Sequence, residues 1–181
     1  MQNDVIMAGF GGQGILLIGK MLAYTGMQEG LEVSWMPSYG PEMRGGTANC
    51  TVVISDRPVG SPVIQSPRAV VAMNLPSLDK FEPMVRKGGL LLINSSLIDR
   101  SSTRDDIRIL LVPANDIAME LKNPRGGNMV ALGAYVGSSH AVPIDAVERV
   151  VRETFSSKPQ VIDANIAALH RGYELGEQAV A

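Results

Sequence analysis

The stretch Asp4-Val5-Ile6-Met7-Ala8-Gly9-Phe10-Gly11-Gly12-Gln13-Gly14 is an apolar run that ends in closely spaced glycines. Such a run is typical of a buried strand that enters a glycine-rich turn before a helix. Gly9, Gly11 and Gly14 follow the spacing G-x-G-x-x-G, which lets the backbone turn sharply and lets a phosphate approach the main chain. The stretch therefore predicts an α/β fold with a candidate anion site at the turn.

Beyond this turn, apolar runs of strand length alternate with segments of helical periodicity. After the first strand, strands are expected at 32–36, 47–55, 68–73, 90–94 and 107–112, and helices at 15–30, 76–85, 113–122, 128–137, 143–155 and from about 159 or 164 to the end. Strands separated by helices imply right-handed crossovers and a largely parallel sheet. The run 47–55 follows a strand that is expected to stop at Pro37, with only a loop between them. We therefore predict one Rossmann-like three-layer domain over 1–181, with a mainly parallel, partly mixed sheet.

Composition and charge narrow the classes of partner that the chain can bind. The 181 residues carry a formal net charge of −2, with 45% hydrophobic and 19% charged residues, as in ordinary globular domains. No basic run is present, so we expect no nucleic-acid partner. The first apolar run is too short and too interrupted by glycine to span a membrane, and no positive segment precedes it. We therefore expect a cytoplasmic protein without membrane contact.

The cysteine and histidine content argues against a metal centre built by this chain. Cys50 is the one cysteine, which rules out an internal disulfide and a cysteine-ligated iron–sulfur cluster. His140 and His170 stand far apart without a ligand pattern around them, so we predict no metal ligands. Cys50 falls in an expected strand, where the role of a small core residue is favoured.

A dinucleotide site would need an acidic residue at the end of the second strand, to hold the ribose hydroxyls. The second strand ends at Trp35-Met36-Pro37, and Glu32 stands at its beginning. The glycine spacing therefore lacks its usual partner, and binding of NAD or FAD is the weaker interpretation. Two others stay open: the glycines only permit close strand–helix packing, or the helix N-terminus receives an anion such as a cofactor phosphate or a partner's carboxylate.

A second glycine-rich segment, Ser38-Tyr39-Gly40-Pro41-Glu42-Met43-Arg44-Gly45-Gly46, follows the second strand, where open α/β sheets place ligands. The guanidinium of Arg44 is suited to a bidentate contact with a phosphate or carboxylate. Glu42 can instead pair with Arg44 and hold the segment rigid. A solvated surface loop with a weak ion pair is the remaining alternative.

These two segments carry a resemblance to a known family. Gly9-Phe10-Gly11-Gly12-Gln13-Gly14, followed by Ser38 to Gly46 and then Thr47-Ala48-Asn49-Cys50, resembles the gamma subunit of 2-oxoacid:ferredoxin oxidoreductases. Asn128-Met129-Val130-Ala131-Leu132-Gly133-Ala134 is similar to a third signature of that family, and the resemblance covers nearly the whole chain. The sequence of residues 45–50 resembles that of 2-oxoglutarate-type members more than that of pyruvate-type members.

The resemblance implies an accessory role in a larger enzyme. Members of this family oxidatively decarboxylate a 2-oxoacid with thiamine diphosphate and magnesium, transfer the acyl group to coenzyme A, and reduce ferredoxin through iron–sulfur clusters. This chain shows neither a Gly-Asp-Gly motif leading to an Asn pair, for thiamine diphosphate, nor a cysteine set for a cluster. We therefore expect no catalytic residues and no cofactor bound by this chain alone. Alpha, beta and ferredoxin-like delta subunits are the expected partners, and self-association is expected as an option for the isolated chain.

Its expected tasks are docking against the thiamine-bearing subunits and shaping the coenzyme A channel. Gln13 is expected to donate and accept hydrogen bonds at the turn, Arg44 to meet an anion or a partner carboxylate, and Asn128 either to line the site or to cap the helix that starts there. A free-standing NAD or FAD oxidoreductase and a non-enzymatic assembly module remain alternatives. The predicted cofactor-binding or subunit-contact residues are Gly9, Gly11, Gly12, Gln13, Gly14, Tyr39, Glu42, Arg44, Gly45, Gly46 and Asn128.

Overall fold

The computed structural model describes residues 2–39 and 47–180, which form one six-stranded sheet with helices on both faces. The strand order is β2-β3-β1-β4-β5-β6, and β3 is antiparallel to both of its neighbours while β1, β4, β5 and β6 are parallel. The predicted mainly parallel, partly mixed sheet is therefore confirmed. The strands are β1 (Gln2–Phe10), β2 (Glu32–Tyr39), β3 (Thr47–Ser55), β4 (Ala69–Ala72), β5 (Leu90–Asn94) and β6 (Arg108–Val112).

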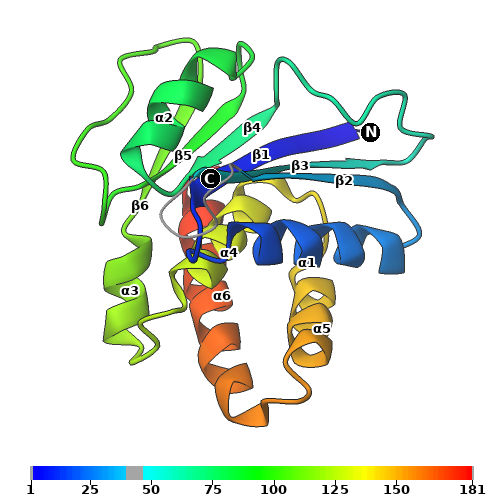
Figure 1. Ribbon diagram of the computed structural model, residues 1–181, viewed down its shortest axis with the longest axis vertical. Coiled ribbons are helices and arrows are strands. Elements are labelled where there is room, and N and C mark those ends of the chain that lie inside the picture. Colours follow the sequence, from blue (N-terminus) through cyan, green and yellow to red (C-terminus); the bar gives the residue numbers. More distant parts are fainter. Residues whose placement is uncertain (1, 40–46, 181) are drawn as a thin grey trace.

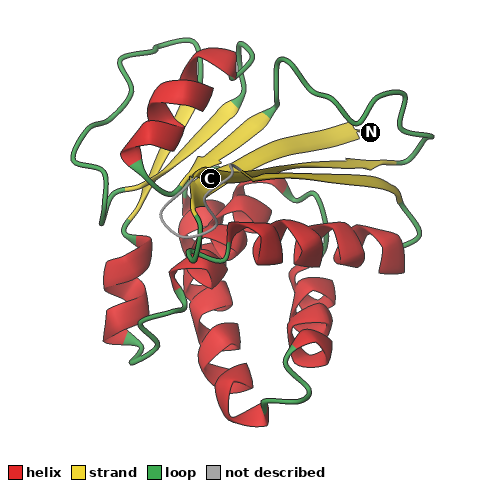
Figure 2. Cartoon of the chain, in the orientation of Figure 1, coloured by secondary structure: helices red, strands yellow, loops and turns green. Residues whose placement is uncertain are grey.

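The helices make two layers of unequal size around the sheet. Figures 1 and 2 show α2 on one face and α1, α4, α5 and α6 on the other, which confirms the predicted three-layer arrangement. The helices are α1 (Ile15–Gln28), α2 (Leu75–Phe81), α3 (Ala114–Glu120), α4 (Gly127–Ser139), α5 (Ile144–Thr154) and α6 (Ile162–Gln178), with short 3-10 turns at Glu82–Met84 and Pro159–Val161. None of the helices within 2–39 and 47–180 is both long and apolar enough to cross a membrane.

The second strand continues past the residue that was expected to end it. Pro37 lies inside β2 and pairs with Cys50 of β3, so the prediction of a stop at Pro37 was wrong. A proline is tolerated in an edge strand, because its missing N–H can face away from the ladder. The order of strands puts β2 at the sheet edge, where this proline is tolerated. Tyr39, which was expected in a loop, is the last residue of the same strand.

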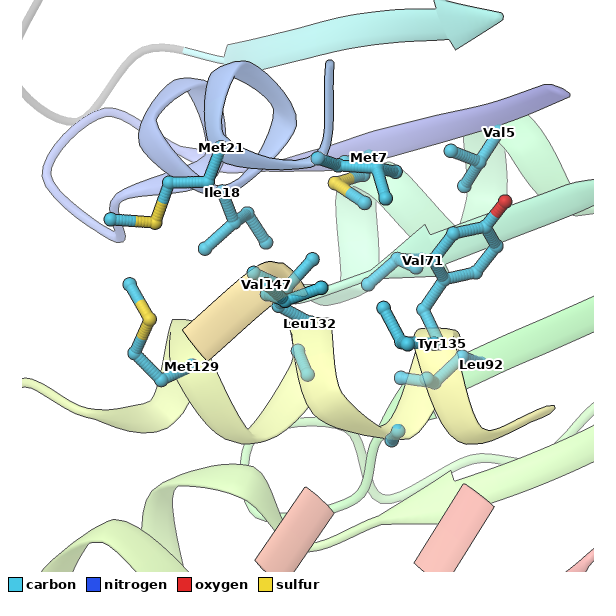
Figure 3. Close-up of a cluster of buried hydrophobic side chains, with 14 of the residues drawn as sticks. Val5, Met7, Ile18, Met21, Val71, Leu92, Met129, Leu132, Tyr135 and Val147 are labelled. Atoms are coloured by element: carbon cyan, nitrogen blue, oxygen red, sulfur yellow. The ribbon is translucent and has the colours of Figure 1, made fainter. Parts of the chain in front are cut away.

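Alternation along β1 divides the core between the two faces of the sheet. Val5 and Met7 join the larger cluster beneath α1 and α4, whereas Ile6 and Ala8 join the smaller cluster beneath α2. Figure 3 shows the larger cluster, in which side chains of β1, β4 and β5 meet residues of α1, α4 and α5. Both faces of β1 are buried, which is why its sequence is a continuous apolar run rather than an alternating one.

Helix α4 is buried along its whole described length except for its last residue, because α6 packs directly against its backbone. Gly133 and Gly172 mark the closest approach. A Cβ added at Gly133 would collide with the carbonyl oxygen of Leu169, and one added at Gly172 with that of Val130. Small residues therefore allow the two helix backbones to touch, and α4 becomes a rigid axis between the sheet and α6.

Candidate functional site

The turn after β1 has the backbone shape that its glycines predict. Gly12 and Gly14 have φ angles of +98° and +74°, in the left-handed region that side chains disfavour. Gly9 sits at the end of β1, where an added Cβ would lie 2.9 Å from the Ile15 side chain at the start of α1. The glycines thus serve both the sharp turn and the close strand–helix packing, and Gly11 lies between them in the turn.

The side chain of Gln13 closes this turn and ties it to the next parallel strand. Its Oε1 atom accepts a hydrogen bond from the Phe10 amide at 2.6 Å, and its Nε2 atom donates to the carbonyl of Met73 at 3.3 Å. Met73 directly follows β4, so Gln13 links the carboxyl ends of two neighbouring strands. Both functions of the amide, donation and acceptance, are used within the chain.

Asn128 lies against the same turn from a distant part of the sequence. Helix α4 begins at Gly127 with Gly126 as its N-cap residue and without a side-chain cap, so of the two roles left open for Asn128 the helix cap is not the one observed. Its Nδ2 atom instead donates to the carbonyl of Gly14 at 3.4 Å, and its Oδ1 atom accepts from the Met129 amide at 2.9 Å. Asn128 therefore joins the start of α4 to the start of α1.

A cleft of about 640 Å³ opens beside this contact. Gly12, Gln13 and Gly14 line one side of it, and Gly127 and Asn128 line another. The helices α1 and α4 both begin at this cleft, and neither has an acidic residue in its first turn. The positive ends of two helix dipoles therefore lie at one common space, which favours an anion there.

Two cations reinforce this positive character. Arg125 and Lys158 line the cleft, and no carboxylate stands among its described lining residues. Both side chains are exposed, so they can turn toward a ligand without breaking a buried contact. We refer to the space between the turn at residues 12–14, the start of α4 and these two cations as the amide cleft.

Asparagine side chains at this edge of the sheet were not predicted. Asn94 ends β5 fully buried, and its Nδ2 atom donates to Oδ1 of Asn115 at 2.8 Å while its Oδ1 atom accepts from the Ala114 amide at 3.2 Å. Asn123 donates to Oδ1 of Asn165 at 3.0 Å. Asn115, Asn123 and Asn165 all line the amide cleft. An asparagine at the end of an otherwise apolar strand, as at Asn94, is the sequence signal that could have identified this edge.

The second predicted segment is only partly placed. Glu42, Arg44, Gly45 and Gly46 lie outside the described residues. Tyr39 is described through its backbone alone, which pairs with Ala48 of β3. The amide cleft is therefore built from the first and third sequence segments.

Cys50 has the structural role expected from the sequence. It is fully buried, and its thiol points toward the Ile15 carbonyl, with 3.8 Å between Sγ and the oxygen. Burial raises the pKa of the Cys50 thiol from 9.0 to about 12, against a smaller opposing effect of Trp35. A neutral, inaccessible thiol is a poor nucleophile and a poor metal ligand. Among residues 2–39 and 47–180, no group of histidine, cysteine and carboxylate side chains is arranged to hold a metal ion.

Comparison with known proteins gives one consistent result. Residues 4–175 match the family model described as pyruvate ferredoxin/flavodoxin oxidoreductase. The ketoisovalerate oxidoreductase subunit VorA of Methanothermobacter marburgensis is 42% identical over 169 residues, which are 93% of this chain and 35% of that protein. The chain thus spans about a third of the length of this relative.

Other relatives match along most of their own length. The 2-oxoglutarate synthase subunit KorC of Methanocaldococcus jannaschii is 30% identical over 181 residues, covering 98% of this chain and 96% of that protein. Among solved structures, the gamma subunit of a keto/oxoacid ferredoxin oxidoreductase from Geobacter sulfurreducens superposes with a TM-score of 0.82 at 27% identity, over 97% of this chain and 99% of that one.

Proposed function

Because this chain belongs to the pyruvate ferredoxin/flavodoxin oxidoreductase family, we propose that it works as the gamma subunit of a heteromeric 2-oxoacid:ferredoxin oxidoreductase. Such an enzyme converts a 2-oxoacid, with loss of carbon dioxide, to an acyl-coenzyme A and reduces ferredoxin. In this proposal the other subunits supply the reacting groups, since the one thiol of this chain is buried and neutral. Its tasks are to dock against the other subunits and to shape the channel of coenzyme A. The assembled enzyme works in the cytoplasm.

The amide cleft is the observation that carries the coenzyme A part of this proposal. Coenzyme A is a polyanion, and the cleft offers two helix N-termini, Arg125 and Lys158 without a described carboxylate to oppose them. Its volume of about 640 Å³ lies within the range of ordinary ligand sites. The amides of Asn115 and Asn128 add donors and acceptors along its wall.

The remaining cofactors belong to other subunits in this proposal. Thiamine diphosphate with magnesium, and the iron–sulfur clusters, supply the chemistry that cleaves the 2-oxoacid and carries its electrons. A cluster needs several cysteine thiolates, and this chain holds only the buried Cys50. Alpha, beta and ferredoxin-like delta subunits are the partners that would hold these groups.

The substrate is a 2-oxoacid. We propose 2-oxoglutarate, because the sequence of residues 45–50 resembles that of 2-oxoglutarate-type members. Ketoisovalerate is the competing candidate, since the VorA relative carries that substrate in its name. The ratio of kcat/KM for the two acids in the reconstituted enzyme decides between them. A higher value for ketoisovalerate would replace 2-oxoglutarate in the proposal and leave the role of the subunit unchanged.

Reconstitution with the partner subunits tests the proposed function. The isolated chain is expected to show no turnover, and the complex to reduce ferredoxin with a 2-oxoacid and coenzyme A. Replacing both Arg125 and Lys158 by alanine should raise KM for coenzyme A about tenfold and leave KM for the 2-oxoacid within about twofold. Arg57→Ala, an exposed arginine outside the cleft, is the matched control and should change neither constant.

The two alternatives predict different outcomes in the same preparation. A free-standing oxidoreductase would bind NADH or a flavin at the turn of residues 12–14 and turn over without partners. An assembly module would form the complex but give the double variant a normal KM for coenzyme A. Either result would overturn the coenzyme A role of the amide cleft.

A further inference from the structure

Three arginines from separate segments meet at the amino edge of the parallel strands, far from the amide cleft. They surround the turn Gly88–Gly89, which precedes β5. The amide of Arg108 donates to the carbonyl of Gly89 at 2.8 Å, and the amide after Gly89 donates to the carbonyl of Arg68 at 2.8 Å. The amide of Arg86 donates to the carbonyl of the residue before Arg68 at 3.1 Å. Backbone hydrogen bonds therefore hold the three positions together.

The absence of a side chain at Gly89 is what permits this approach. An added Cβ there would lie 2.8 Å from the carbonyl oxygens of both Arg68 and Arg86. Any other residue would push these two backbone segments apart. Gly88 has a φ angle of +74°, so the turn itself also depends on glycine.

The arginines stand around a pocket of about 130 Å³ whose floor is polar and buried. Asp4, Tyr135 and Ser138 line it with exposed fractions of 5%, 1% and 4%. At roughly 30 Å³ for each water, the space equals about four water molecules. It suits a small polar group rather than an apolar side chain. We call it the arginine pocket.

The charge in this pocket is positive although one carboxylate lines it. Asp4 is engaged by Arg68: its Oδ1 atom accepts from the Arg68 amide at 2.7 Å, and its Oδ2 atom lies 3.7 Å from the Arg68 Nε. Within 2–39 and 47–180, no carboxylate pairs with the guanidinium of Arg86 or Arg108. The nearby Asp106 is already bound by Arg104, with both N···O distances at 2.8 Å.

The C-terminal end of α4 adds a partial negative charge at the pocket, which is smaller than the positive charge of the arginines. The helix ends at Ser139, so its last carbonyls carry roughly half a negative charge toward the pocket. Three guanidinium groups against the Asp4 carboxylate and this partial charge leave about +1.5. With 13 residues at ~1.5 Å each, α4 separates the arginine pocket at its end from the amide cleft at its start by nearly 20 Å. Figure 1 shows the sheet that α4 runs along.

We propose that the arginine pocket is a second binding site, which holds one oxyanion group, a phosphate or a carboxylate, between the guanidiniums of Arg86 and Arg108. These side chains are exposed and lack carboxylate partners among the described residues, and a planar guanidinium binds such groups through paired hydrogen bonds. The group can come from a free small anion or from an acidic side chain of a partner subunit. The pocket itself does not depend on the function proposed above, whereas a partner carboxylate as its occupant rests on that function.

Titration of the full isolated chain with inorganic phosphate tests this site. Amide chemical shifts are followed by nuclear magnetic resonance, with sodium chloride at matched ionic strength as the reference. Saturable shifts are expected at residues 86–90, 108 and 138–139. In the double variant with Arg86→Ala and Arg108→Ala, the affinity at these amides should fall at least about tenfold. Both side chains are exposed, so the variant is expected to keep its fold, which the unchanged spectrum elsewhere verifies.

Arg171→Ala is the control, because Arg171 is exposed on α6 and does not line the pocket. Shifts that stay linear in phosphate concentration, or that are equal in the double variant and in Arg171→Ala, would overturn the site. Shifts confined to the amide cleft would also overturn it while leaving the proposed function standing. Weaker assembly of the double variant with its partners identifies a partner carboxylate as the source, and unchanged assembly identifies a free anion.

Discussion

The side-chain amide of Asn128 lies 3.4 Å from the carbonyl of Gly14, 114 positions earlier in the chain. Gly14 has a left-handed backbone, and an added Cβ would overlap the Asn128 amide. Gly14→Ala should therefore cost backbone strain and a steric clash together, about 3 kcal/mol of unfolding free energy. Urea denaturation followed by circular dichroism measures this loss.

Gly12→Ala separates the strain from the clash. Gly12 is also left-handed, with φ at +98°, but no atom lies within 4 Å of the position of its Cβ. We expect a loss of about 1 to 2 kcal/mol, from the backbone alone. Equal losses in the two variants would show that the contact between α1 and α4 adjusts freely at Asn128.

Close packing of α4 against α6 predicts a larger effect. A Cβ at Gly133 or Gly172 would enter the backbone of the facing helix, which cannot move aside as a side chain can. Each alanine variant should lose about 3 kcal/mol or more, because the two helices must separate along their length. Gly60→Ala, in a loop with open space around its Cβ, should change stability by less than about 0.5 kcal/mol. Thermal unfolding of the three variants side by side tests this difference.

The strands and helices that depend on short stretches of sequence were predicted from those stretches. The continuous apolar run at 90–94 coincides with β5, and the helix expected to begin at Pro76 is present as α2, with this proline in its first turn. The error at Pro37 has a tertiary cause. Whether a proline stops a strand depends on its place in the sheet, and the edge position of β2 follows from pairing with β3.

The residues of the candidate site also divide into those that local sequence predicts and those that only distant contacts bring together. The glycines of the first turn were found because their spacing is local, and Asn128 was found through a family resemblance. Its contact with Gly14 joins residues 114 positions apart. The arginine pocket was missed because Arg68, Arg86 and Arg108 make no basic run, and only the pairing of β4, β5 and β6 brings them together.

The neutral state of Cys50 predicts a specific loss of stability at high pH. Its pKa is raised from 9.0 to about 12 in the folded protein, so the folded state retains a proton that the unfolded chain releases. The stability that this thiol contributes is fully present below pH 9 and is lost as the pH rises toward 12. Compared with Cys50→Ala, the wild-type chain should lose up to about 1.4 kcal/mol more per pH unit within this window. Parallel urea titrations at pH 8 and pH 10 measure this difference.

Gln13 offers the sharpest test of how the turn and the amide cleft act together. Gln13→Glu keeps an oxygen to accept from the Phe10 amide but removes the donor to the Met73 carbonyl, so stability should fall by about 1 kcal/mol. The same change places a negative charge in a cleft that holds Arg125 and Lys158 and no described carboxylate. In the reconstituted enzyme, KM for coenzyme A should therefore rise several-fold while KM for the 2-oxoacid stays constant. Gln13→Met removes the hydrogen bonds without adding charge, so it should destabilise the turn at least as much but raise KM less. If the two variants raised KM equally, the effect would come from the shape of the turn, and the electrostatic role of the cleft would have to be abandoned.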